Sequence, residues 1–213
     1  MVSTGAVVGI ALVALGLALT PGPNMLYLVS RSITQGSAAG LISLLGVAVG
    51  FLAYLAAAVA GIATVFHAVP AAYTTLKLAG AAYLLYLAWQ AIRPGGTAVF
   101  APRELPRDPR RRLFLMGLTT NLLNPKIAVL YISLLPQFVD VDRGSVAMQS
   151  LILGSIQIAI GLTVDAVIVL TAGSLALFLA RRPAWVRAQR YLMGGVLAAL
   201  ALRLVTDRGR APA

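Results

Sequence analysis

The sequence predicts an all-α, polytopic integral membrane protein of about six transmembrane helices, arranged as a 3+3 inverted repeat. Three observations support this fold class. The 213 residues are 60% hydrophobic with a mean hydropathy of +0.90, whereas a soluble domain averages about 45–50% apolar residues. Only 11% of the residues are charged, too few to cover a globule of this size. The apolar residues also form runs near or above the ~20 residues that cross a bilayer.

The spans are the apolar runs that lie between charges and turn residues. The fifth run is too long for a straight crossing, so it must tilt, break or extend beyond the bilayer. All of them belong to one transmembrane domain, residues 1–213, with a tail at 206–213. The six predicted spans lie at residues 5–30, 38–66, 70–93, 113–137, 146–180 and 186–205.

The basic residues gather between the spans and predict the orientation. The loop at about 94–112 holds five arginines, and the next most basic connection lies two spans later, at about 181–190. Because cytoplasmic loops are rich in Lys and Arg, the 94–112 loop is predicted to be cytoplasmic, and a connection at Arg31 falls on the same side. Both termini then lie outside. Arginines in the tail disagree, so an apolar run that does not fully cross remains an alternative.

Two proline breaks interrupt the first and fourth spans, in the stretches TPGPNM (20–25) and NLLNPK (121–126). Pro23 and Pro125 are 102 positions apart, close to half the chain. Each half, at about 1–93 and 113–205, therefore holds three spans with the break in the first. Two tandem three-span units must insert in opposite orientations, which predicts an inverted repeat.

The breaks predict a binding site. A proline leaves a carbonyl one turn earlier without its donor, and such backbone is tolerated in a membrane where it lines a cavity. The half-helix after the break suits a carboxylate, and the unwound carbonyls suit an ammonium group, so the pair matches an amino-acid zwitterion. Kinks that only help packing are the alternative. The predicted substrate-binding residues are Pro21, Gly22, Pro23, Asn24, Asn121, Asn124, Pro125 and Lys126.

Asp165 is the only acid that the spans place deep in the membrane, which makes it a functional hypothesis by default. We predict that it couples protons or counters the substrate ammonium, with a fixed ion pair or interhelical hydrogen bond as the alternative. Lys126 is expected to pair with Asp165 or with a substrate carboxylate. Gln157 could support the same polar face or serve packing. Lys77 is expected to snorkel outward, and His67 to lie exposed at a turn.

The residue inventory excludes several classes of protein. No cysteine, one histidine and six acids leave little for a metal centre, thiol chemistry or an acid–base enzyme, so no catalytic residue, metal ligand or cofactor is predicted. The net charge of +11 is explained by the basic membrane loops and lipid contact, not by a nucleic-acid partner. A divalent cation exporter and a non-transporting scaffold or lipid-handling protein remain alternatives to an amino-acid exporter.

Three segments resemble the LysE/RhtB family of bacterial amino-acid exporters, in the family's order and spacing. They are the PGPN stretch, the run from Lys77 to Tyr83, and the NPK…PQF stretch, and Asp165 also fits. The resemblance implies a multi-pass inner-membrane antiporter that exchanges an amino acid for a proton, with a homodimer left open. Many relatives carry an acid where this chain has Phe51. The expected substrate is therefore a small neutral amino acid of the homoserine, threonine or leucine type.

Overall fold

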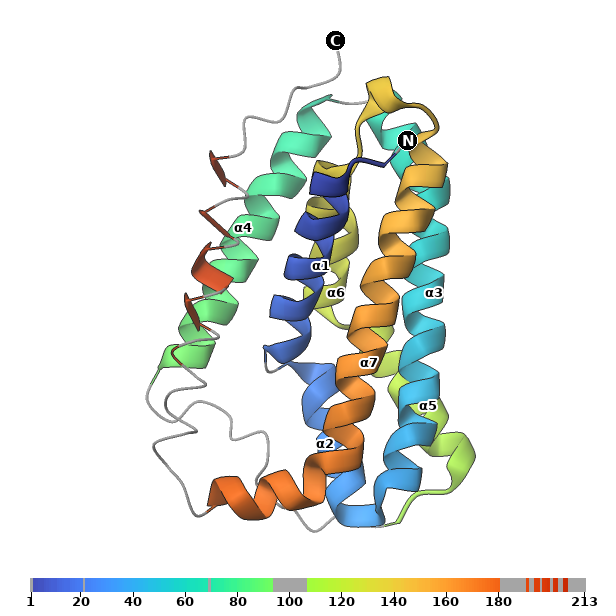
Figure 1. The fold of residues 1–213 in the computed structure, drawn as a ribbon, viewed down its shortest axis with the longest axis vertical. Coiled ribbons are helices and arrows are strands. Elements are labelled where there is room, and N and C mark those ends of the chain that lie inside the picture. The colour runs from blue at the N-terminus through green and yellow to red at the C-terminus, as the bar shows by residue number, and fades with distance from the viewer. Residues whose placement is uncertain are drawn as a thin grey trace.

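The protein is all-helical over the residues that its computed structural model describes, which are 2–20, 22–68, 70–93, 107–180 and isolated positions between 191 and 206 (Figure 1). Pro21 and most of the sixth predicted span lie outside them. The α-helices are α1 (Thr4–Leu19), α2 (Pro23–Gln35), α3 (Ser37–Ala68), α4 (Pro70–Ile92), α5 (Arg110–Leu122), α6 (Pro125–Val129) and α7 (Val146–Ala180). A π-helical turn η1 (Leu130–Leu134) and a 3₁₀ turn η2 (Leu135–Phe138) continue α6, and η3 (Val141–Arg143) precedes α7.

Both predicted breaks are confirmed. The axes of α1 and α2 differ by 52°, and those of α5 and the segment Pro125–Phe138 differ by 47°. Pro23 and Pro125 are each the first residue of the second half-helix, where a missing N–H leaves no hydrogen bond unmade. Asn124 caps α6 by accepting a hydrogen bond from the Lys126 N–H at 3.0 Å.

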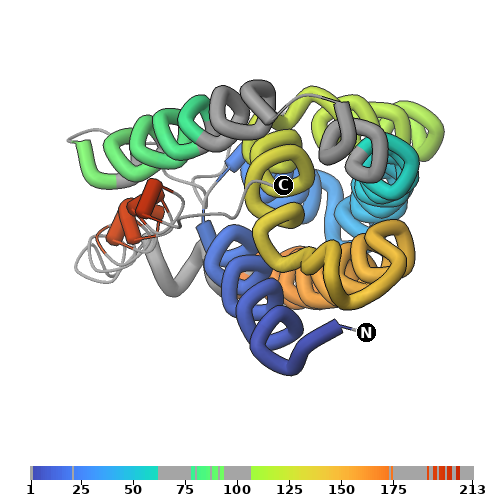
Figure 2. The backbone as a smooth tube through the Cα atoms, turned by 90° about the horizontal axis from the view of Figure 1, so that it is seen from above, coloured from blue at the N-terminus to red at the C-terminus, as the bar shows by residue number. Residues whose placement is uncertain are grey.

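The two broken segments run antiparallel. Asp108, just before α5, contacts Arg31 near the end of α2, whereas Asn124, just after α5, contacts Asn24 at the start of α2. In Figure 1, α1 and α2 descend through the bundle while α5 and α6 ascend. This is the relation that an inverted repeat requires between the first spans of its two halves. Seen from above, the α6–η2 segment lies in the middle of the bundle, among α1, α3, α4 and α7 (Figure 2).

Long apolar helices surround the breaks, as a polytopic membrane protein requires. Within α3 and α7, Ser37–Gly61 and Val146–Ala172 are long and apolar enough to cross a membrane, and each bent pair can count as one more span. The described residues thus hold up to four spans by length and composition. The long run at 146–180 is a single helix of 35 residues. The count of six remains a prediction.

The first predicted span ends too early, which corrects the connection expected at Arg31. Helix α2 continues to Gln35, and Arg31 is buried within it. The guanidinium can lie inside the bundle because the Asp108 carboxylate pairs with it at 2.5 Å. The chain turns instead at Gly36, whose φ of +89° lies in the region that favours glycine. Helix α5 likewise begins at Arg110, before the expected start at 113.

Helices α3 and α5 approach through two glycines, at Gly46 and Gly117. A Cβ on Gly46 would lie 2.0 Å from the Phe114 carbonyl oxygen, and one on Gly117 would lie 2.1 Å from the Ser43 carbonyl oxygen. In both cases the atom in the way is backbone, which a rotamer change cannot move. Small residues at such crossings let membrane helices pack closely.

We expect Gly46→Ala to lower the stability of the bundle by about 1–3 kcal/mol, because α3 and α5 must separate to admit the methyl group. Gly61→Ala is the matched control, since it lies in the same helix with nothing within 4 Å of a Cβ there. Melting of the purified proteins in detergent measures both. Equal melting temperatures for the two variants would show that the close approach is not needed.

Candidate functional site

The two breaks meet inside the bundle. The Asn124 side-chain N–H donates to the Asn24 Oδ1 at 3.0 Å, across 100 positions of sequence. Both residues are buried, with 5% of Asn24 and none of Asn124 exposed. Asn24 follows Pro23 of the first break, and Asn124 precedes Pro125 of the second. The polar side chains of the two breaks therefore form one constellation.

Lys126 of the second break caps the backbone of the first. Its Nζ donates to the carbonyl oxygens of Leu17 at 2.8 Å and Thr20 at 2.9 Å at the end of α1, where the Leu17 carbonyl also accepts a hydrogen bond from the Thr20 N–H at 3.2 Å. These carbonyls are its hydrogen-bond partners, while the expected carboxylate partner Asp165 lines the same cavity and interacts with Lys126 electrostatically. Among the described residues, no ion pair within 4 Å joins it to Asp165.

Two tyrosines that no sequence pattern singled out support the second break. The Tyr54 hydroxyl of α3 donates to the Leu122 carbonyl oxygen at the end of α5, at 2.8 Å. Its ring stacks on Tyr131 of η1, with centroids 5.6 Å apart and planes 18° apart. The Tyr131 hydroxyl donates to Gln157 Oε1 of α7 at 2.7 Å. Gln157 is thus fixed by Tyr131 as well as facing the cavity described next.

A cavity of about 30 Å³ lies at the level of the breaks. That volume holds little more than a water molecule. The Asn24 Nδ2 is buried there without a hydrogen-bond partner among the described residues, and the Asp165 carboxyl in the same wall interacts electrostatically with Lys126. The polar residues in its wall are Asn24, Lys126, Gln157 and Asp165, and the others are Ala14, Leu17, Ala18, Met25, Phe51, Ile127, Leu130 and Gly161.

The remaining predicted site residues lie around this constellation or away from it. Gly22 leaves room for Lys126, because a Cβ there would lie 3.1 Å from the Nζ. Asn121 is fully buried beside Gly50 of α3, outside the cavity wall, with both polar atoms of its amide unpartnered. The side chains of Lys77 and His67, like the whole of Pro21, lie outside the described part of the structure.

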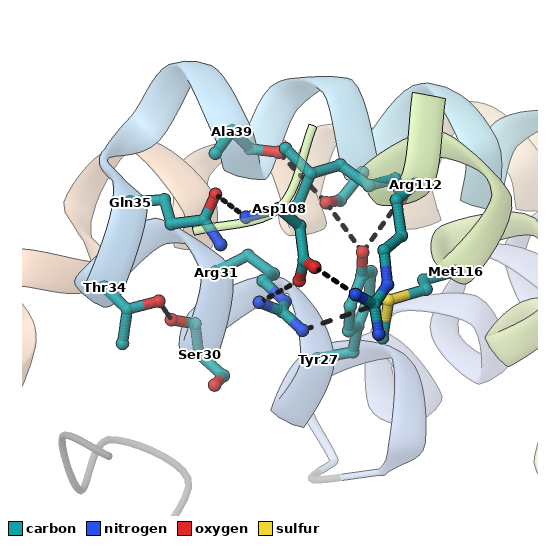
Figure 3. Close-up of polar contacts among 11 residues, drawn as sticks. Tyr27, Ser30, Arg31, Thr34, Gln35, Ala39, Asp108, Arg112 and Met116 are labelled. Atoms are coloured by element: carbon teal, nitrogen blue, oxygen red, sulfur yellow. Dashed lines mark hydrogen bonds and ion pairs between the residues drawn. The ribbon is translucent and has the colours of Figure 1, made fainter. Parts of the chain in front are cut away.

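A second polar cluster joins the end of α2 to the start of α5 (Figure 3). The Asp108 carboxylate pairs with Arg31 at 2.5 Å and with Arg112 at 2.9 Å, and its side chain is only 3% exposed. The Asp108 N–H donates to Gln35 Oε1 at 3.1 Å. The Arg31 guanidinium lies over the Tyr27 ring, 5.6 Å from its centroid. No sequence pattern singled out Asp108, which lies within the predicted 94–112 loop.

Metal ligation gains no support from the described residues. They contain no group of three His, Cys, Asp or Glu side chains that could hold a metal ion together. The cavity wall offers no such group either, since Asp165 is the only acid among its described residues.

Long apolar helices, two antiparallel broken spans and a buried polar cavity at their crossing define a class of polytopic membrane proteins to which many secondary transporters belong. A protein-family model described as "LysE type translocator" matches residues 15–208. The chain belongs to this LysE family of translocators.

Curated relatives include named efflux proteins. The chain is 32% identical over 148 residues to a homoserine/homoserine lactone efflux protein of Salmonella typhimurium, covering 70% of this chain and 71% of that one. It is 26% identical over 188 residues to a leucine efflux protein of Klebsiella pneumoniae, covering 88% and 89%. An uncharacterized membrane protein of Pseudomonas aeruginosa is 29% identical over 196 residues, with 88% and 89% covered. No solved structure shows significant similarity.

Proposed function

We propose that this protein is a secondary exporter of small neutral amino acids, driven by proton antiport. It would work by alternating access in a bacterial inner membrane, with the 94–112 loop in the cytoplasm. The observation that supports this most is the cavity at the crossing of the two breaks, which presents a cation and an acid, Lys126 and Asp165, on apolar surroundings. The efflux proteins of homoserine and leucine among the relatives agree with it.

The groups in the cavity wall match the two ends of a zwitterion. An ammonium has three N–H donors, and the carbonyls of Leu17 and Thr20 take two of those on Lys126. The third, together with the unpartnered Asn24 Nδ2, can receive a substrate carboxylate. The Asp165 carboxylate can receive the substrate ammonium or exchange a proton.

The wall also favours a neutral side chain on the substrate. A dibasic amino acid brings a second cation, which needs a second acid when it is taken out of water. This wall contains one acid, Asp165, and Phe51 presents an apolar ring to the cavity. An amino acid exceeds the present cavity, so we infer that the half-helices move about the breaks to admit it.

Efflux from proteoliposomes tests the proposal. Vesicles loaded with labelled leucine, threonine, homoserine or lysine are diluted into a more acidic buffer, with protein-free vesicles as the control. We expect the inward proton gradient to accelerate the loss of a neutral amino acid, and a protonophore to cancel the acceleration. Lysine should be retained. Retention of every neutral amino acid, or release of a divalent cation by the same vesicles, would contradict the proposal.

A further inference from the structure

The Lys126 ammonium lies where the end of α1 concentrates negative partial charge. The last carbonyls of a helix carry the negative end of its dipole, and the Nζ lies 2.8 Å from one of them, that of Leu17, and 2.9 Å from the carbonyl of the C-cap residue Thr20. A third carbonyl of that turn, from Gly16, is taken by the Thr20 hydroxyl at 2.7 Å. The broken end of α1 is therefore a small cage of oxygens, filled by one cation.

The surroundings fit that one side chain. Lys126 reaches the cage from the start of α6, over 100 positions along the chain, and it is buried with 6% exposed. Gly22 leaves space for the Lys126 side chain, because a Cβ at this position would lie 3.1 Å from the Nζ and 3.3 Å from the Cε. The Nζ donates its hydrogen bonds to main-chain oxygens, while the Asp165 carboxyl in the same cavity wall acts on the cation electrostatically without an ion pair within 4 Å among the described residues.

Unwound carbonyls of this kind bind coupling cations in other transporters with broken helices. Main-chain oxygens suit either a monovalent metal ion or an ammonium group, since both need several acceptors and no specific base. Here the covalent chain already supplies the cation, so a free ion has no place in the cage.

We propose that Lys126 is a tethered resident cation that fills a monovalent-cation site formed by the Leu17 and Thr20 carbonyls and joins the two broken helices. Its removal uncovers a site for a free primary ammonium ion or Na⁺. The inference rests on the proposed function only in treating the breaks as the centre of the transporter.

Chemical rescue tests this directly. Lys126→Ala removes the atoms from Cγ to Nζ, which n-propylammonium replaces one for one. We expect the variant, purified in detergent, to melt roughly 10 °C below the wild type, because two buried carbonyls lose a charged donor. Added n-propylammonium should restore much of the loss, and n-propanol, with the same shape and no charge, should not.

Three further measurements keep the proposal falsifiable. Lys126→Arg, which keeps a cation, should melt close to the wild type, whereas Lys126→Met should not. Gly46→Ala, destabilised elsewhere, should show no response to n-propylammonium. Wild-type melting should be the same in sodium and choline chloride, while Lys126→Ala should gain stability in sodium chloride alone. Equal melting of the Met and Arg variants, or equal rescue by n-propanol, overturns the proposal.

Melting is measured without any flux, so its outcome is separate from that of the export experiment. If n-propylammonium rescues Lys126→Ala and no amino acid leaves the vesicles, the cation site stands and the proposed function fails. If export is confirmed and n-propylammonium does not rescue Lys126→Ala, the proposed function stands and the cation-site proposal fails.

Discussion

Asp165→Asn should abolish proton-driven export and leave the protein folded. The carboxyl is buried at the cavity wall, with 6% of the residue exposed, and interacts electrostatically with Lys126. Since no ion pair within 4 Å holds it among the described residues, the acid can exchange a proton or a substrate ammonium. Asparagine has nearly the same shape but carries neither a charge nor an exchangeable acid proton. The proton gradient can then no longer drive export through this residue. Export under an inward proton gradient should fall to the level of protein-free vesicles.

Two comparisons separate loss of coupling from loss of the protein. Exchange of labelled for unlabelled amino acid at equal pH needs no net proton movement, and Asp165→Asn should retain measurable exchange. Asp142→Asn makes the same chemical change at an exposed turn and should export at the wild-type rate. Gradient-driven export by Asp165→Asn at the wild-type rate would remove Asp165 from the coupling mechanism.

Asp108→Asn should cause the largest loss of stability among single polar substitutions in the described residues. The substitution leaves the Arg31 guanidinium, with a side chain 8% exposed, without its carboxylate at the α2–α5 contact. Removing one partner of a buried ion pair costs about 3–5 kcal/mol, because the other charge remains buried and unpaired. The melting temperature in detergent should fall by roughly 10 °C.

Arg112→Gln is the matched control for this ion pair. Arg112 contacts the other oxygen of the same carboxylate at 2.9 Å, yet its side chain is 64% exposed. Exposed pairs contribute about 0–1 kcal/mol, so this variant should melt within a few degrees of the wild type. In the double variant Arg31→Met/Asp108→Asn, part of the loss should return, since no buried charge is left unpaired and the exposed Arg112 remains in water. A larger loss for Arg112→Gln than for Asp108→Asn would contradict this account.

Much of the architecture could be predicted from the sequence, because its causes are local or compositional. Apolar runs identify α3 and α7 as membrane helices, since a bilayer requires about the same length of apolar chain everywhere. Pro23 and Pro125 interrupt their helices through missing N–H groups, whatever surrounds them. Their half-chain spacing predicted two antiparallel broken segments, which the structure contains.

The contacts at the site depended on how distant segments meet. Membrane depth predicted Asp165 or a substrate carboxylate as the partner of Lys126, and the two side chains do interact electrostatically, but the ammonium donates its hydrogen bonds to the Leu17 and Thr20 carbonyls. Asn121 belongs to the same motif as Lys126, yet it lies beside Gly50 because it precedes the bend and faces α3. No spacing rule links Lys126 to residues more than 100 positions away.

By itself, the sequence determined that this chain is a helical membrane protein of the LysE family with two proline breaks half a chain apart. Hydropathy and proline stereochemistry act over one turn or one span, so they can be read along the chain. Only the tertiary structure decided that Asn24 bonds Asn124, that Lys126 caps α1 and that Asp108 neutralises Arg31. The reason is physical: a buried polar group must find a partner wherever the fold provides one, and packing alone sets which partner is within reach.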